Sequence, residues 1–137
     1  MNMSGSCLCG SVKYTCSGEV AMAGNCHCLD CKKASGSGYA PTLFVPESSV
    51  KITGEVKYYE STGSSSGTKV KRGFCPNCGS QIFGKPGALP GMLAIRAGSL
   101  EELSQYKPQI DIFTSRSPAW DCMDPNLPKF AEMPPRK

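Results

Sequence analysis

Cys75-Pro76-Asn77-Cys78-Gly79 is the stretch that decides the fold, because it forms a Cys-x-x-Cys knuckle typical of zinc sites. Pro76 restricts one backbone angle, and Gly79 permits the left-handed turn in which amide N–H groups face the sulfurs. One such pair supplies half of the tetrahedral four-sulfur shell that structural zinc prefers. The knuckle therefore predicts a second pair of cysteines that completes the shell.

Cys7 and Cys9 are the pair that remains for this purpose. Residues two apart in an extended segment project to the same side, so both thiolates can converge on one ion. We predict a closed, structural zinc site bound by Cys7, Cys9, Cys75 and Cys78. Structural zinc contributes about 10–16 kcal/mol of apparent binding free energy, against a net stability of about 5–15 kcal/mol for a typical domain. We therefore expect metal removal to unfold the protein.

The segment Cys26-His27-Cys28-Leu29-Asp30-Cys31 offers three further thiols. A turn can bring Cys28 and Cys31 together, and Cys26 reaches the same ion because it lies two residues from Cys28. Three protein ligands leave one coordination position for water or substrate, which is the general pattern of a catalytic zinc. We predict a second, open zinc site at Cys26, Cys28 and Cys31.

The assignment of the cysteines leaves alternatives open. Cys7 and Cys9 could instead complete the shell of the middle cluster. Cys16, in an expected strand, is interpreted as a buried small apolar residue. Cys122 could supply a fourth ligand to the open site and so close it.

Polar residues beside the three-cysteine segment are candidates for supporting roles. The single histidine, His27, lies between two expected ligands, so its side chain is predicted to point away from their metal. It is interpreted either as a base or substrate contact, or as a packed or surface residue. Asp30 is an acceptor for the ligands or, preferably, a turn residue. The amides of Ser35-Gly36-Ser37-Gly38 could hold a carboxylate, or the segment is a plain turn.

Composition favours metal over disulfides and sets the class of protein. Nine cysteines in 137 residues are many, and their odd number fits complete pairing poorly. Residues 1–6 are polar and lack the apolar segment of an export signal, so we expect a reducing, cytoplasmic location. The length suits one domain. A net charge of +4 without a dense basic stripe argues against nucleic-acid binding, and no apolar run approaches the ~20 residues of a membrane span.

Short alternating or apolar runs bounded by turn residues predict a mainly β fold of antiparallel strands. The expected strands are 11–16, 39–45, 49–53, 55–60, 68–74, 80–83, 92–97 and 109–114. Helix is limited to short turns, one at residues 29–35 and one beginning at the capping box Ser99-Leu100-Glu101-Glu102. Thr53-Gly54-Glu55 is expected to form a tight turn between two strands. Residues 61–67 are expected to form a flexible loop and 125–137 an irregular Pro-rich tail.

Four segments together resemble the signatures of the glutathione-dependent formaldehyde-activating enzyme family, which also includes centromere protein V. These segments are residues 5–12, 26–36, 74–80 and 110–120. Their order and spacing are more specific than any one cysteine pair, and the resemblance runs from about residue 4 to 121. It implies one zinc-stabilised domain over residues 1–137, with its core at about 4–121 and a Pro-rich tail at 122–137.

The fold implied by the resemblance is of the β-tent type, in which small antiparallel sheets lean together, as in zinc-binding partners of Rab GTPases. The resemblance also implies two zinc ions, the structural one at Cys7, Cys9, Cys75 and Cys78. The implied catalytic zinc lies at Cys26, Cys28 and Cys31, in agreement with the division reached from spacing.

The function implied by the resemblance is that of a carbon–sulfur lyase. The expected reaction joins a small thiol, glutathione in the family's named reaction, to formaldehyde or a related aldehyde, giving S-hydroxymethylglutathione. Two alternatives from other classes remain, because one fold can host several functions. One is a zinc-binding interaction module without activity, and the other is a thiol-redox or metal-storage protein.

Overall fold

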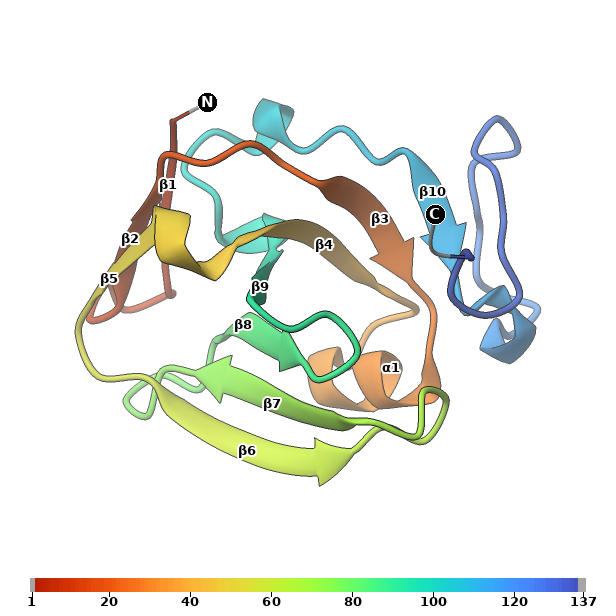
Figure 1. The fold of residues 1–137 in the computed structure, drawn as a ribbon, viewed down its shortest axis with the longest axis horizontal. Helices are drawn as coiled ribbons and strands as arrows, with labels where there is room; N and C mark the ends of the chain where they lie inside the picture. Colours follow the sequence, from red (N-terminus) through yellow and green to blue (C-terminus); the bar gives the residue numbers. More distant parts are fainter. Residues whose placement is uncertain (1, 136–137) are drawn as a thin grey trace.

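The computed structural model describes residues 2–135 and folds them into two β-sheets that lean together (Figure 1). The three-stranded sheet has the order β1-β2-β5, with bounds Met3–Ser6, Lys13–Cys16 and Val50–Thr53. The seven-stranded sheet has the order β10-β3-β4-β9-β8-β7-β6, with bounds Ile110–Ile112, Met22–Cys26, Ala40–Pro46, Met92–Arg96, Gln81–Pro86, Lys69–Phe74 and Lys57–Thr62. The mainly β fold is therefore confirmed.

Helix within the described residues is short, as predicted from the turn-rich composition. The α-helix α1 spans Leu29–Ser35, where the sequence predicts a helical turn. The four 3-10 turns are η1 at Glu47–Ser49, η2 at Ala97–Ser99, η3 at Leu103–Gln105 and η4 at Thr114–Arg116. None of the helices in residues 2–135 has the length and apolar character needed to span a bilayer.

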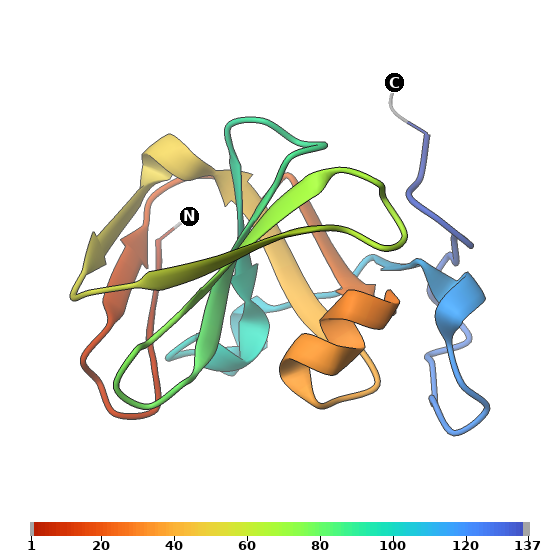
Figure 2. The same ribbon diagram turned by 90° about the horizontal axis from the view of Figure 1, so that it is seen from below.

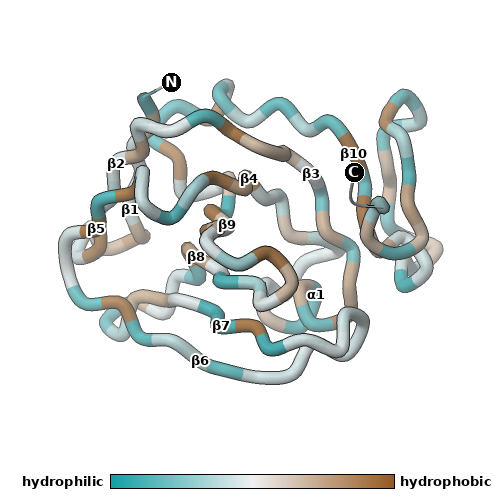
Figure 3. Tube along the Cα trace, in the orientation of Figure 1, coloured by the Kyte–Doolittle hydropathy of each residue, from teal (hydrophilic) through white to brown (hydrophobic). Residues whose placement is uncertain are grey.

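The main core lies between the two sheets. Phe83, Leu43 and Ile95 of the large sheet are 0–1% exposed, and they share one cluster with Tyr14 and Val12 from the small sheet's side. The rings of Tyr14 and Phe83 meet edge to face at a centroid distance of 5.3 Å. The hydropathy colouring in Figure 3 shows apolar residues on the inner strands β4, β8 and β9. Each fully buried large side chain stabilises the fold by about 1.5–3 kcal/mol.

The other face of the large sheet forms the floor of the site. Residues two apart on a strand share a face, so Thr42 lies on the opposite face of β4 from Leu43. The register pairs Thr42 with Arg96, and Gly84 with both Ala94 and Arg72. The same face of neighbouring strands therefore presents Thr42, Arg96, Gly84 and Arg72. Helix α1 lies at the end of this face, directly after β3 (Figure 2).

Three details of the strands differ from the prediction. Strand β10 pairs with β3 in parallel, so the pairing is not uniformly antiparallel. Strands β1 and β3 were not predicted, because their sequences MSGS and MAGNC lack β-branched and aromatic residues. The turn at Gly54 joins two strands as predicted, but β5 and β6 belong to different sheets, so it forms a corner and not a hairpin.

The capping-box prediction is wrong. Ser99 ends η2 and donates its hydroxyl hydrogen bond to the Arg96 carbonyl at 2.7 Å, so it caps no following helix. Leu100 is held extended by a bridge to Gly5, and its side chain is buried in the core. Helical geometry returns only at η3, where Glu102 accepts from the Ser104 amide. The tertiary bridge to the small sheet therefore overrides the local signal.

The tail is irregular, as predicted, but it is docked against the sheet. The Asp111 amide donates to the Pro128 carbonyl, and the Phe130 amide donates to the Asp111 carbonyl, each at 2.9 Å. Lys129 forms an isolated parallel bridge with Asp111. These bonds cover the outer edge of β10, which would otherwise present unpaired backbone groups. Residues 136–137 of the predicted tail lie outside the described residues.

Candidate metal centre

Four cysteine sulfurs gather where the two sheets meet. Cys7 and Cys9 follow β1, and Cys75 and Cys78 lie between β7 and β8; their Sγ atoms all lie within 4.8 Å of one another. The Sγ distances are 3.6 Å from Cys7 to Cys9 and 3.8 Å from Cys9 to Cys75. Tetrahedral zinc with Zn–S bonds of about 2.3 Å separates its sulfurs by about 3.8 Å, whereas a disulfide bond is about 2.05 Å long. The spacing fits a metal shell.

Matching turns shape both halves of this closed cluster. Gly79 adopts a φ of 78°, and its amide donates to the Cys75 carbonyl at 2.8 Å. Gly10 adopts a φ of 81°, and its amide donates to the Cys7 carbonyl at 3.2 Å. A side chain would strain either turn, because L-residues rarely adopt positive φ. The two glycines thus let each short loop fold back toward its sulfurs.

Polar groups around the closed cluster favour thiolate sulfur. The Val12 amide donates to Cys7 Sγ at 3.2 Å, and the Asn77 side-chain amide donates to Cys9 Sγ at 3.3 Å. Hydrogen bonds with Ser11 and then Asn77 lower the pKa of the Cys9 thiol to about 7. Donors aimed at sulfur stabilise its charged form, which is the form that binds metal.

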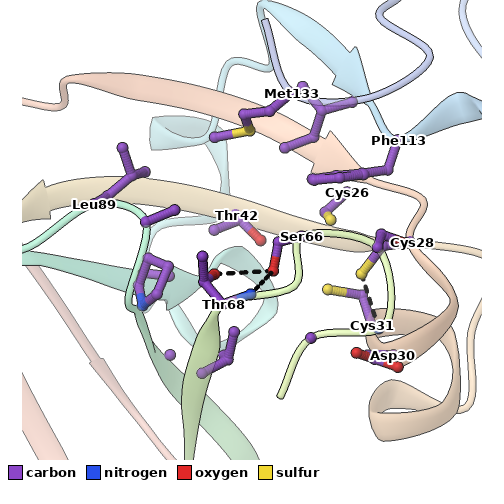
Figure 4. A pocket seen from close by; sticks show the side chains of 18 of the residues that line it. Cys26, Cys28, Asp30, Cys31, Thr42, Ser66, Thr68, Leu89, Phe113 and Met133 are labelled. Atoms are coloured by element: carbon purple, nitrogen blue, oxygen red, sulfur yellow. Dashed lines mark hydrogen bonds between the residues drawn. The ribbon is translucent and has the colours of Figure 1, made fainter. Parts of the chain in front are cut away.

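A second group of sulfurs lies at the start of α1. Cys26 ends β3, Cys28 is the N-cap of α1 and Cys31 lies in its first turn; their Sγ atoms lie within 4.8 Å of one another. The Cys31 amide donates to Cys28 Sγ at 3.2 Å, which fixes the turn between them. Figure 4 shows the three sulfurs converging at one side of a pocket. All three residues are buried.

The charge around this triad is supplied by arginines from the sheet. Arg72, which is 8% exposed, donates from Nη1 to Cys31 Sγ at 3.7 Å. Hydrogen bonds from Cys26 and Cys28, with the positive charges of Arg96 and Arg72, lower the pKa of Cys31 to about 2. Hydrogen bonding to Cys28 and Cys31, together with burial, raises the pKa of Cys26 well above its ordinary value. A divalent ion binding here would therefore displace protons from the triad.

The triad opens into a cavity of about 380 Å³, a size that accommodates small organic ligands. Its floor is the large sheet, with Ala94 and Thr42 among the lining residues. Phe113 and Met133 form an apolar wall opposite, and the loop carrying Ser66 borders the entrance (Figure 4). The cavity is what the sequence could not predict, because its walls come from segments far apart in the chain.

Cys122 does not join the triad. It is exposed, and no further Cys, His, Asp or Glu within residues 2–135 completes the group of Cys26, Cys28 and Cys31. The structure also separates Cys7 and Cys9 from the triad, so the alternative in which they complete the middle shell does not occur. Cys16 is 1% exposed on β2, where it packs as a small apolar residue.

The polar neighbours of the triad have structural partners. His27 points away from the sulfurs and is fully buried, with Nε2 at 2.8 Å from Asp111 Oδ1 and Nδ1 at 2.5 Å from Asp121 Oδ2. Asp30 accepts from the amide and the hydroxyl of Ser64, each at 2.8 Å. It therefore anchors the loop at the cavity entrance, a role that neither sequence interpretation included. The 35–38 segment forms the C-cap of α1, with Gly36 at φ 70°.

A family model described as glutathione-dependent formaldehyde-activating enzyme matches residues 2–116. The chain belongs to this family. Membership supports a glutathione-dependent formaldehyde-activating role. The geometry of the two cysteine clusters shows that each could hold a metal ion.

A crystal structure of a Rhodobacter sphaeroides protein has a similar fold, with a TM-score of 0.57 and 20% sequence identity. The likeness covers 93% of this chain and 99% of that chain. At this identity it shows the fold alone. Among curated proteins, none matches this chain.

Proposed function

We propose that this member of the formaldehyde-activating family is a zinc-dependent carbon–sulfur lyase. Its reaction adds a thiol such as glutathione to formaldehyde or a related aldehyde, giving S-hydroxymethylglutathione in the first case. The observation that carries the proposal is the triad of Cys26, Cys28 and Cys31, which opens into a cavity and has no fourth ligand within residues 2–135.

The donor sets fit two zinc ions with different roles. Cys7, Cys9, Cys75 and Cys78 would hold a structural ion, since four thiolates fill a tetrahedral shell. The triad would hold a catalytic ion with one open position. When bound there, zinc supplies a coordination position at which a substrate thiol loses its proton.

The protein's own residues prepare the site for a thiolate. Three cysteinates make the triad electron-rich, and the Arg72 guanidinium at Cys31 offsets part of that charge. Phe113 and Met133 line one wall of the cavity with apolar side chains, and electrostatic interactions are stronger where apolar side chains replace water. The substrate sulfur forms a bond to the carbonyl carbon, and the carbonyl oxygen takes up a proton from solvent, so that S–H adds across C=O. The reverse reaction expels the thiolate.

The remaining assignments follow from this proposal. A thiol-dependent enzyme with free cysteines suits the reducing cytoplasm, and we propose that location. We also propose that residues 1–137 form one domain with its core at about 4–121. The tail bonds to β10 described above support its inclusion in that domain.

Cys28→Ala tests the proposal. The variant is expected to lose turnover of glutathione and formaldehyde while its circular dichroism spectrum stays that of the wild type, because the triad lies at one end of the sheet. Two zinc ions per wild-type chain, and about one per variant chain, are the expected metal contents. The rival interaction module predicts no turnover by the zinc-loaded wild type. Unfolding of the variant would make the triad structural.

A further inference from the structure

Two arginines from different strands face the same cavity. Arg72 lies on β7 and Arg96 on β9, and β8 runs between them. Two strand spacings separate their backbones by about 10 Å. Gly84 of β8 lies between them, and a Cβ there would lie 3.6 Å from Arg96 Nη2, so the Arg96 guanidinium lies over Gly84. Both guanidinium groups therefore line the cavity into which the triad opens.

Among residues 2–135, most of the hydrogen-bond donors on these arginines have no partner. A guanidinium group carries five N–H donors. Within residues 2–135, Arg72 finds one partner, Cys31 Sγ, and Arg96 finds one partner, Thr42 Oγ1 at 2.7 Å. Arg96 Nε is buried without any partner. Guanidinium donors that are removed from water normally pair with an acceptor, so this space is suited to an anionic ligand.

The partner of Arg96 fixes its position without neutralising it. The Thr42 hydroxyl donates its hydrogen to the Ala40 carbonyl at 3.0 Å, so it presents a lone pair to Arg96. None of the salt bridges in the described chain involves Arg96 or Arg72. The acidic residues that line the cavity are engaged elsewhere: Asp30 binds Ser64, and Glu132 accepts from Ser115. The Arg96 charge is therefore held in place and unpaired.

The two arginines differ in whether they form a hydrogen bond to the triad. Three cysteinates and a divalent ion carry a net charge of minus one, and Arg72 is in contact with that group through Cys31. Arg96 lies on β9, the strand beyond Gly84, and its positive charge also acts on Cys31, but its hydrogen bond goes to Thr42 and not to a sulfur. A ligand that places its sulfur at the triad can therefore reach Arg96 with a second, anionic group, because the triad and Arg96 line the same cavity. A carboxylate one or two residue lengths from the sulfur extends about 3.5–7 Å along a peptide.

We propose that Arg96, held by Thr42 over Gly84, binds a carboxylate of the thiol substrate, so that the site selects thiols bearing a carboxylate. This inference rests on the proposed function, since it assumes that a thiol binds at the triad. Arg96 is a specificity-determining residue in this arrangement. Guanidinium and carboxylate form a paired, charge-assisted hydrogen bond that a neutral amide cannot reproduce.

The test compares two thiols of the same size on the zinc-loaded protein. Calorimetry measures the affinity of 3-mercaptopropionate and of its neutral amide, 3-mercaptopropionamide, for the wild type and for Arg96→Gln. The wild type is expected to bind the carboxylate about 10- to 100-fold more tightly than the amide. Arg96→Gln is expected to lose that preference while its zinc content is unchanged. Lys71→Gln removes one positive charge from an exposed position of β7 and is expected to keep the preference.

Each other outcome rejects a distinct part of the reasoning. Equal affinity of the wild type for both thiols overturns the carboxylate subsite but leaves thiol binding at the triad intact. If Arg96→Gln weakens the binding of both thiols equally, Arg96 balances the charge of the thiolate, and the carboxylate subsite is again rejected. Absence of binding by either thiol and by glutathione removes the proposed function itself. The comparison of thiols on the wild type needs no variant, so the proposal is tested even if Arg96→Gln fails to fold.

Discussion

Replacing Cys75 with serine should lower the stability of the folded state by more than replacing Cys28 with alanine. The reason is the length of chain that each cluster closes. Cys9 and Cys75 lie 66 positions apart in sequence, and a cross-link across a loop of that length stabilises the folded state by about 4 kcal/mol in the chain-entropy treatment. Cys26 and Cys31 are five positions apart, which gives about 2 kcal/mol.

These free energies convert to measurable melting temperatures. For a chain of this length, 1 kcal/mol shifts Tm by about 3–5 °C. Cys75→Ser is therefore expected to melt about 12–20 °C below the zinc-loaded wild type, and Cys28→Ala at most about 6–10 °C below it. Scanning calorimetry of metal-loaded proteins measures both shifts. Chelation of zinc from the wild type should reproduce or exceed the Cys75→Ser effect, because it removes both cross-links.

Cys122→Ser is the control, since Cys122 is exposed and lies outside both clusters. Its free energy of unfolding should stay within about 0.5 kcal/mol of the wild type. Should Cys75→Ser melt within 3 °C or so of the wild type, or above Cys28→Ala, the closed cluster would not be the cross-link between the sheets. The division of roles between the two clusters would then be refuted.

Two further predictions concern the corner at Gly54 and the buried histidine. Gly54→Ala should lower the free energy of unfolding, measured by chemical denaturation, by about 2–5 kcal/mol, because φ is 99° and a Cβ would lie 2.0 Å from the Ser11 carbonyl oxygen. The control Gly91→Ala, at φ 80° with open space around the Cβ position, should lower it by only about 1–2 kcal/mol. Equal losses of stability in the two variants would contradict the proposed clash. His27→Ala should lower the free energy of unfolding by about 3–5 kcal/mol, because it leaves the buried carboxylates of Asp111 and Asp121 without their shared partner. It should also speed proteolysis of the tail. An unchanged rate of tail cleavage would show that this network does not hold the tail.

The cysteine clusters could be predicted because their chemistry is local. Cys75 and Cys78 are joined by a turn whose residues are visible in the sequence, and the structure brings them together with Cys7 and Cys9. Strands with alternating or β-branched residues could be predicted for the same reason. β3 could not, because MAGNC has little strand propensity of its own; it is held by hydrogen bonds to β4 on one side and β10 on the other.

The arginines of the cavity have no comparable local signal. Arg72 and Arg96 approach the same space only because β7, β8 and β9 pair in one particular register, and no residue within a single strand indicates that register. The one hint is that Arg72 shares a face of its strand with Val70 and Phe74, so that a charged residue lies on an otherwise apolar face. The capping box at Ser99 fails for the opposite reason, since a local signal is overridden by the bridge from Leu100 to Gly5.

The sequence distance between the two clusters has a consequence for how the protein acquires metal during synthesis. Cys7, Cys9 and the triad emerge from the ribosome well before Cys75 and Cys78, and chains grow at about 5–20 residues per second. A nascent chain therefore passes through a period of seconds in which Cys7 and Cys9 face any available ion without Cys75 and Cys78, while the triad is already complete. Early capture would join Cys7 or Cys9 to the triad and would have to be undone by ligand exchange. The yield of correctly loaded protein should thus depend on the timing of zinc supply as well as on its amount.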